Sequence, residues 1–320
     1  MRLSRPPPPP PAAAPGAARA AALAAAIAAA ALGCAAPARE GRPAAGPAGP
    51  DGEVRLTFAW PPDLRLRVAL DHREWRGREE RRARYAHRVV VAPEGRWLRV
   101  SVRDAEAEGD TPGLELNLAL NETLDQVVAA DGSYVRTEGL ERALELLGAD
   151  DEESRATSRQ ALERVAELDW ELLVGAWADR ALRPGRPEPR AFPGAVPLLP
   201  SVPALLDVEA TLAGRVACEE GEAAAACVEL VWRASPGPRA RAAAVERLLG
   251  SREAGAPPLD VEGLQASAEA RLVTEPDTLV PHRLTVREEL RLAVRQPGGD
   301  VEEVVDRSED RYRFARETEL

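Results

Sequence analysis

The sequence predicts a mainly antiparallel β protein with inserted helices, an α+β fold in which a curved sheet or half-barrel packs on a helical lid. Two observations predict it. Apolar and polar residues alternate over most of the chain, and the period changes to that of a helix only in the middle. Strands with one apolar and one charged face are typical of an antiparallel sheet solvated on one side. The amphipathic helical segment is the expected cover for the apolar face.

Strands are expected first along the chain. They are placed at residues 54–58, 64–70, 85–91, 98–102 and 114–120, where apolar residues recur at every second position. The pair Asp131-Gly132 predicts a hairpin between residues 125–130 and 133–137, because this dipeptide favours tight two-residue turns.

A helical insertion is predicted at about residues 139–182. Its first part stops at Gly148, and Asp150 followed by Glu153 resembles a carboxylate version of the capping box. Apolar residues then recur at helical spacing as far as Leu182. The proline-rich stretch 183–204 has no period and is predicted to be a connector.

The second half returns to strands. They are expected at residues 208–218 and 227–233 and, after a helical patch at 236–249, as a meander at 261–273, 279–294 and 301–314. Residues 53–320 are therefore expected to form a single β-rich domain.

The first residues show a short basic start, an uncharged apolar run at 20–32 and then Ala31-Leu32-Gly33-Cys34. The run is too short to cross a bilayer as a helix and is typical of a signal peptide. This segment resembles the precursors of bacterial lipoproteins, although its leucine sits one place later than in their usual motif. The resemblance implies a signal peptide at 1–33, lipidation of Cys34, and attachment to the cell envelope. A plain cleaved signal that discards Cys34 is the alternative.

Residue 35 is alanine and not aspartate, which resembles lipoproteins sorted to the outer membrane and facing the periplasm. Residues 34–52 are rich in Ala, Gly and Pro, and are expected to be a flexible tether. With Cys34 lipidated, Cys218 and Cys227 remain. They end two predicted strands, so a disulfide is expected in an oxidising compartment, with two free thiols as the alternative.

The pattern of strands around a helical segment weakly resembles the half-barrel of periplasmic lipoprotein carriers and outer-membrane lipoprotein receptors. The passage from Asp131-Gly132 to Glu138-Gly139-Leu140 also resembles uncharacterised envelope lipoproteins. These resemblances imply a cavity for a hydrophobic ligand. Trp170 and Trp177, seven residues apart on one helix face, and Leu173 are candidates for lining it. The alternative is that they are ordinary core residues.

Charge and motifs argue against several classes of function. The formal net charge is −11, which disfavours a nucleic-acid partner. His72, His87 and His282 lack metal-ligand spacing and are expected on strand surfaces, so no metal and no cofactor is expected. No catalytic motif appears, and an enzyme is not expected. The expected role is to bind a hydrophobic ligand in the envelope; the alternative is a structural or assembly lipoprotein that docks on a protein partner.

One further segment allows two interpretations. Residues 73–88 combine many arginines with a few glutamates, and all basic residues of the chain are arginine. The segment could contact anionic lipid headgroups. Alternatively, it is a solvated hairpin of alternating ion pairs, with its arginines reflecting a bias of the whole composition.

Overall fold

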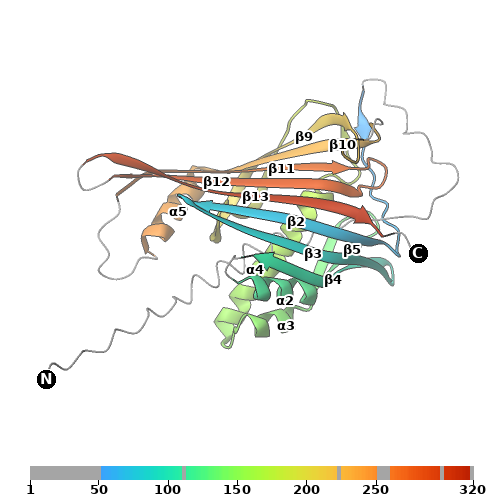
Figure 1. Cartoon of the computed structure of the whole chain (residues 1–320), viewed down its shortest axis with the longest axis horizontal. Helices are drawn as coiled ribbons and strands as arrows, with labels where there is room; N and C mark the ends of the chain where they lie inside the picture. Colours follow the sequence, from blue (N-terminus) through green and yellow to red (C-terminus); the bar gives the residue numbers. More distant parts are fainter. Residues whose placement is uncertain (1–51, 110–112, 222–224, 251–259, 296–298, 318–320) are drawn as a thin grey trace.

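The computed structural model describes residues 52–109, 113–221, 225–250, 260–295 and 299–317. Its strands are β1 (Val54–Arg55), β2 (Arg65–Arg76), β3 (Glu79–Glu94), β4 (Trp97–Gly109), β5 (Asp125–Ala129), β6 (Tyr134–Glu138), β7 (Ala181–Leu182), β8 (Glu188–Val196), β9 (Leu199–Val216), β10 (Cys227–Pro236), β11 (Asp260–Thr274), β12 (Pro281–Arg295) and β13 (Val301–Arg316). All but β1 and β7 form an open antiparallel sheet of 11 strands, in the order β6-β5-β4-β3-β2-β13-β12-β11-β10-β9-β8 (Figure 1). The predicted class, mainly antiparallel β with inserted helices, is confirmed.

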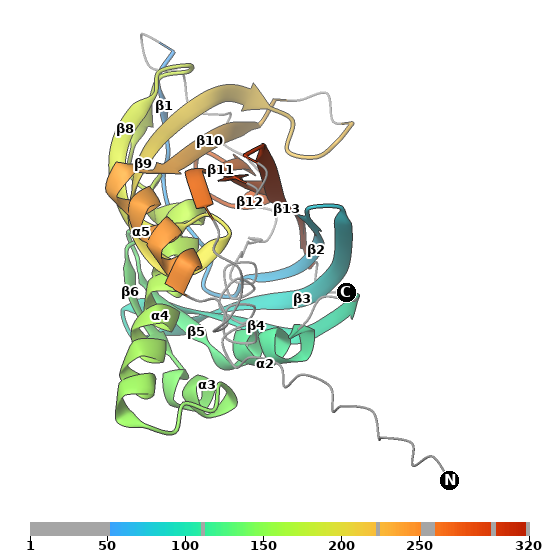
Figure 2. The ribbon, with the colours of Figure 1, turned by 90° about the vertical axis from the view of Figure 1, so that its left-hand side faces the viewer.

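The sheet is strongly curved, and its concave side holds the core (Figure 2). The helices are α2 (Leu114–Thr123), α3 (Leu140–Leu146), α4 (Glu152–Trp170), a π-helical turn η1 (Glu171–Gly175) and α5 (Pro238–Gly250). Helix α4 contacts both edge strands, β6 and β8, and so lies across the open side of the sheet. Helix α5 packs on β8 to β11. No helix in the described part of the chain is long and apolar enough to cross a membrane.

Most predicted strands are confirmed, and their apolar positions face the core. The Asp131-Gly132 hairpin joins β5 to β6, with Gly132 at a φ of 85° that favours glycine. A Cβ at this position would lie 2.8 Å from Cγ of Phe58, so any larger residue would clash with that ring. The cap of helix α4 is Asp151, one residue later than the predicted Asp150, and its carboxylate accepts the backbone N–H of Ser154 at 2.8 Å.

The expectation of a strand at residues 114–120 is wrong, because this segment is helix α2. Its leucines are strong helix formers and the segment has no β-branched residue. Gly113 precedes the helix in a left-handed conformation, and the buried side chains are Asn117 and Leu120. Leucines at every second position also supply neighbours one helical turn apart, so alternation alone did not distinguish the two structures.

The predicted connector at residues 183–204 is also wrong, since it contains β8 and the first part of β9. Prolines suggested an irregular segment, but β8 is an edge strand of the sheet. An edge strand needs only half of its backbone hydrogen bonds, and it therefore tolerates residues that lack an N–H. Only Val54–Arg55 of the strand expected at 54–58 pairs as β1. The following residues stay extended, with Leu56, Phe58 and Trp60 buried.

A disulfide joins Cys218 to Cys227 across the β9–β10 connection, with the Cα atoms 5.0 Å apart. Both cysteines are buried and pack against Val273. The expected disulfide is therefore present, whereas Cys34 lies outside the described residues.

Removing this disulfide in a Cys218→Ala, Cys227→Ala double variant should lower the free energy of unfolding by about 2–3 kcal/mol. The bond closes a short loop, with a sequence separation of 9, and its loss restores conformational freedom to the unfolded chain. Urea unfolding followed by circular dichroism measures the change. Equal stability of the two proteins would contradict a stabilising role.

Candidate ligand site on the concave face

Antiparallel pairing aligns the concave side chains in rows that run across the strands. One row is apolar from end to end and consists of Leu212, Leu230, Leu272, Leu284, Tyr312, Leu70 and Tyr85. It belongs to the main core, together with Trp170 and Trp177. The face is thus closed at this end by packed side chains.

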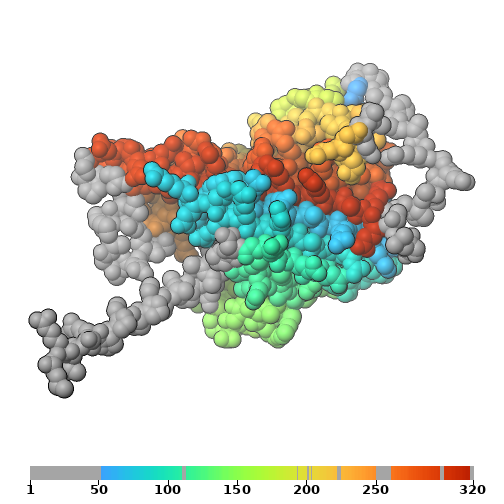
Figure 3. Space-filling model, in the orientation of Figure 1, coloured from blue at the N-terminus to red at the C-terminus, as the bar shows by residue number. Residues whose placement is uncertain are grey.

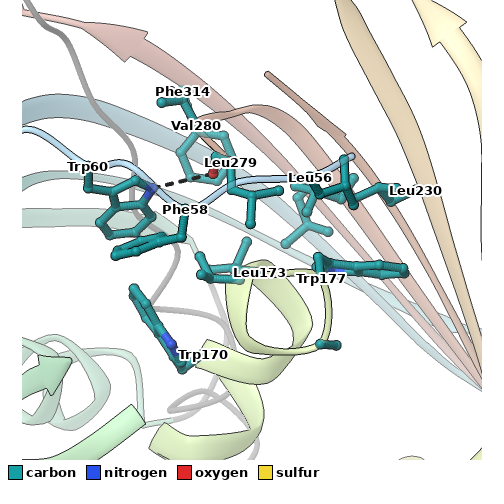
Figure 4. Packing of buried hydrophobic residues seen from close by; sticks show 14 of the residues in the cluster. Leu56, Phe58, Trp60, Trp170, Leu173, Trp177, Leu230, Leu279, Val280 and Phe314 are labelled. Atoms are coloured by element: carbon teal, nitrogen blue, oxygen red, sulfur yellow. Dashed lines mark hydrogen bonds between the residues drawn. The ribbon is translucent and has the colours of Figure 1, made fainter. Parts of the chain in front are cut away.

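The three candidate ligand-lining residues lie inside this core (Figure 4). The exposed fractions of Trp170, Leu173 and Trp177 are 0%, 1% and 1%. The indole N–H of Trp170 donates to the Gly132 carbonyl at 2.7 Å, and its ring meets Trp60 edge to face, with centroids 4.9 Å apart. The structure therefore places these side chains against other core residues, which is the arrangement of the alternative interpretation.

Beyond this row, the concave face divides into an apolar and a polar half. The apolar half lies on β9, β10 and β11, where small side chains form its floor under α5; these are Ala204, Ala234, Ala266 and Ala268. Ala244 of α5 is fully buried against this floor. Leu290 and Leu292 continue the apolar surface on β12, and Val304 of β13 remains 37% exposed. A partly uncovered apolar strip therefore borders α5.

The polar half lies beside it on β12, β13 and β2. Asp310 is directly opposite His72, and its carboxylate is 2.5 Å from His72 Nδ1. In the next row, Glu288 is opposite Ser308 and accepts its hydroxyl at 3.4 Å, and Ser308 is opposite Glu74. We call these five residues, which occupy two neighbouring rows, the polar row: His72, Glu74, Glu288, Ser308 and Asp310. Its side chains are mostly covered, with 18% of His72 and 15% of Asp310 exposed.

Charges in the polar row influence one another strongly. Burial, and then the charge of Asp310, raise the pKa of Glu288 to about 7, although Ser308, the Leu198 N–H and His72 oppose this. Burial alone would lower the pKa of His72, but the hydrogen bond to Asp310 and three nearby carboxylates raise it. Among the described residues, Glu74 has an arginine partner, Arg76 at 2.7 Å, whereas Asp310 and Glu288 have none.

Such a row can bind a group that supplies positive charge or hydrogen-bond donors. A cation placed among these carboxylates would favour their ionised forms, including that of Glu288. Partly buried ionisable side chains with shifted pKa values are typical of functional sites, because they cost stability that the fold alone does not require.

Sequence reasoning missed the polar row, but the alternation contains a signal for it. His72 is in phase with Leu66, Val68 and Leu70, and Asp310 is in phase with Tyr312 and Phe314. A polar residue in phase with core residues points inward.

The expectation that the histidines lie on strand surfaces is wrong for His87. Only 6% of His87 is exposed, its Nε2 has no hydrogen-bond partner in the described part of the chain, and burial lowers its pKa to about 4. His282 is half-buried between Glu219 and Glu275. Among the described residues His282 also lies near both disulfide sulfurs. Sulfurs joined in a disulfide are not thiolate ligands, so this group holds no metal while the bond is intact.

A separate groove lies where β7 and β8 meet the segment before β1. It encloses about 620 Å³ and is lined by Arg180, Arg183, Arg186, Arg190, Glu53 and Glu188 with their neighbours. Glu188 accepts from Arg190 at 3.0 Å and from Arg180 at 3.4 Å, so its charge neutralises part of the arginine cluster. This groove is polar, and it is distinct from the apolar strip beside α5.

No protein-family model and no curated protein matches the chain. Seven solved chains show structural similarity. One, described as lipid–protein interactions in lipovitellin, aligns with a TM-score of 0.39 and 9% identity over 82% of this chain and 25% of that chain. The chain thus corresponds to about a quarter of that structure. A similarity of this size supports no conclusion about function.

Proposed function

We propose that the chain is a lipid-anchored envelope protein that binds an amphiphilic ligand on the concave face of its curved sheet, which acts as a half-barrel. The observation that carries the proposal is that the strand register places an apolar strip next to the polar row on one face. An apolar tail would lie along Leu292 and Val304 beside α5. A cationic or hydrogen-bond-donating head would lie at Glu288 and Asp310.

The apolar part of the proposal rests on exposure. Val304 faces the concave side, yet more than a third of it is exposed, whereas equivalent positions at the other end of the face are buried under Trp170 and Trp177. Burying such surface against an alkyl chain is favourable by about 0.8 kcal/mol per methylene group.

The head-group preference rests on charge. The polar row contains three carboxylates and one histidine. Glu74 is paired with Arg76 at 2.7 Å, whereas Glu288 has a pKa of about 7, which burial raises first and the negative charge of Asp310 raises further. An anionic head would add to this repulsion, whereas an amine would relieve it. The preferred ligand class is therefore a long-chain amine or a neutral amphiphile rich in donors.

The proposal is tested by titrating the full chain with dodecylamine and with dodecanoic acid, each below its micelle-forming concentration, in a calorimeter. We expect the amine to bind at least about tenfold more tightly, a difference of about 1.4 kcal/mol. Ala268→Trp should weaken binding by a similar factor, because Ala268 lies on the floor opposite Glu288. The matched control is Ala293→Trp, since Ala293 is on β12 but on the opposite face of the sheet.

Binding that is unaffected by Ala268→Trp, or an equal affinity for the acid, would contradict the site. The absence of binding to either amphiphile would reject ligand binding. The alternative role, docking on a protein partner, would then be preferred, and it has one observation in its favour. Leu205, next to the edge strand on the convex side of β9, is 61% exposed, and such a side chain suits an interface.

The lipid anchor is proposed from the resemblance of residues 31–34 to a lipoprotein motif, and it is tested separately. A Cys34→Ala variant should move from the membrane fraction to the soluble fraction of the cell envelope, because stable attachment requires the acyl chains that this cysteine would carry. Cys218→Ala is the control, since it also removes one cysteine. Persistence of the Cys34→Ala variant in membranes would show that attachment does not depend on Cys34.

A further inference from the structure

The convex face of β12, β13, β2 and β3 carries an unusual concentration of arginine. Strand pairing places the following side chains on this one face: Arg67, Arg73, Arg82, Arg84, Arg88, Arg283, Arg287, Arg307, Arg311 and Arg313. We call them the arginine face. Few carboxylates lie among them, namely Asp71, Glu80, Glu289 and Glu309. Arginines outnumber carboxylates among these side chains, although the whole chain has a net charge of −11.

Several of these arginines lie directly opposite another arginine. The register pairs Arg67 with Arg88 and Arg73 with Arg82 between β2 and β3, and Arg283 with Arg313 between β12 and β13. Like charges at directly opposed positions destabilise a sheet. A general bias toward arginine explains the absence of lysine, but it does not explain why arginines oppose one another and not glutamate or threonine. The arrangement favours a role that the fold itself does not require.

Ion pairs neutralise only part of this charge. Seven of the ten arginines form a salt bridge. Glu309 pairs with Arg287 and Arg311, Asp71 with Arg84, Glu80 with Arg82, Glu289 with Arg307, Asp104 with Arg88 and Glu220 with Arg283. In the part of the chain that the structure describes, Arg67, Arg73 and Arg313 have no salt bridge. Arg67 and Arg313 are exposed. The unneutralised charge is therefore spread over several strands at about 4.8 Å spacing, and it is not collected in one pocket.

The shape of the face selects the partner. β13, β2 and β3 face the viewer in Figure 3 as a continuous surface, and Figure 2 shows that the sheet bows outward here. Between the arginines lie mostly small side chains such as Ala69, Ala86 and Thr285, with Trp75 as a single large apolar one. The face therefore lacks the apolar cluster typical of the centre of a protein–protein interface. An outward-bowed surface cannot wrap a nucleic-acid duplex, whereas mobile lipid headgroups can adjust to distributed charges.

We propose that the arginine face docks on an anionic phospholipid surface. The inference does not depend on the concave ligand site, because the two lie on opposite faces of the sheet. It is also separate from the proposed anchor, since an acyl chain does not discriminate between neutral and anionic headgroups.

The test is co-sedimentation of the full chain with vesicles of phosphatidylcholine alone and with vesicles that contain about 30 mol% phosphatidylglycerol. The difference between the two partition coefficients is the readout, so that any binding through the N-terminal segment cancels. We expect at least about tenfold stronger partitioning to the anionic vesicles, and its loss at high salt, because exposed charges are then screened.

A triple variant, Arg67→Gln, Arg73→Gln and Arg313→Gln, should remove most of this difference. The matched control carries Arg142→Gln, Arg159→Gln and Arg164→Gln, which change the net charge equally but lie on α3 and α4. Each substitution on the arginine face removes one member of an opposed pair, so the variant is expected to melt at the same or a higher temperature, and thermal unfolding checks this.

Two results would overturn the proposal. One is equal loss of binding in the two triple variants, and the other is equal binding to both vesicle types, whether or not a DNA duplex is retained. In the second case, retention of the duplex would identify nucleic acid as the partner. Failure of amphiphile binding to the concave face would leave this outcome unchanged, so the two proposals are separable.

Discussion

Replacing Trp170 with alanine should lower the free energy of unfolding by about 3–5 kcal/mol. The side chain is fully buried between Phe58 and Trp60, in edge-to-face contact with both. Its removal leaves a large cavity and also leaves the Gly132 carbonyl without the indole donor. Chemical denaturation followed by circular dichroism measures the change, because an indole signal would itself be altered by the substitution.

Trp97→Ala is the matched control for this prediction. Trp97 is half-buried on β4, and its ring is covered by the guanidinium groups of Arg96 and Arg136, each 4.9 Å from the ring centre. Its loss should cost about 1 kcal/mol, the range of an exposed cation–π contact. Similar losses of unfolding free energy in the two variants would show that Trp170 is not at the centre of the core. Trp170 would then remain a candidate for lining a ligand cavity.

The strands of this chain could be predicted from the sequence because nearly all have one buried and one solvent-exposed face. Alternation then reports burial directly, as it does for Leu66, Val68 and Leu70. The same signal fails where a segment is buried differently. Helix α2 has leucines at every second position, so alternation does not exclude a strand there, and helix propensity together with contacts to α3 and β4 favours the helix.

The candidate site could be predicted only in part. That His72 and Asp310 point inward follows from their phase, but that they meet follows from the pairing of β2 with β13. These strands lie at opposite ends of the chain, separated by the whole helical insertion. The same pairing brings β12 and β13 beside β2 and β3 and thereby assembles the arginine face. The arginine-rich segment 73–88 was visible in the sequence, but the register that opposes arginine to arginine was not.

The contribution of Glu288 to stability should be lost as the pH rises from about 5 to about 8, whereas buried His87, whose pKa is lowered to about 4, acts in the opposite direction below pH 6.5. The folded state raises the pKa of Glu288 from the usual 4.5 to about 7, so the folded protein holds this proton more tightly than the unfolded chain. The resulting stabilisation is complete below pH 4.5 and is lost as the pH rises through 7. His72 acts in the same direction, because its pKa is also raised in the folded state.

A Glu288→Gln variant keeps a neutral side chain at every pH. Its change in the free energy of unfolding from pH 5 to pH 8 should therefore be about 2 kcal/mol more favourable than that of the wild-type chain. Glu289→Gln is the matched control. The neighbouring Glu289 lies on the convex face, where its hydrogen bond to Arg291 lowers its pKa. Glu289 therefore loses its contribution to stability only as the pH falls through the acid range. This variant should keep the wild-type dependence of the free energy of unfolding on pH between pH 5 and pH 8.

Urea unfolding at intervals of pH measures these slopes, and equal slopes in the wild-type chain and Glu288→Gln would contradict the assignment. The same proton connects stability to the proposed ligand. An amine bound beside Glu288 and Asp310 would favour the ionised carboxylate, and the protein should therefore release a proton when dodecylamine binds near pH 7. Calorimetry in buffers of different ionisation enthalpy detects that proton. Its disappearance in Glu288→Gln, but not in Glu289→Gln, would place the bound head at the polar row.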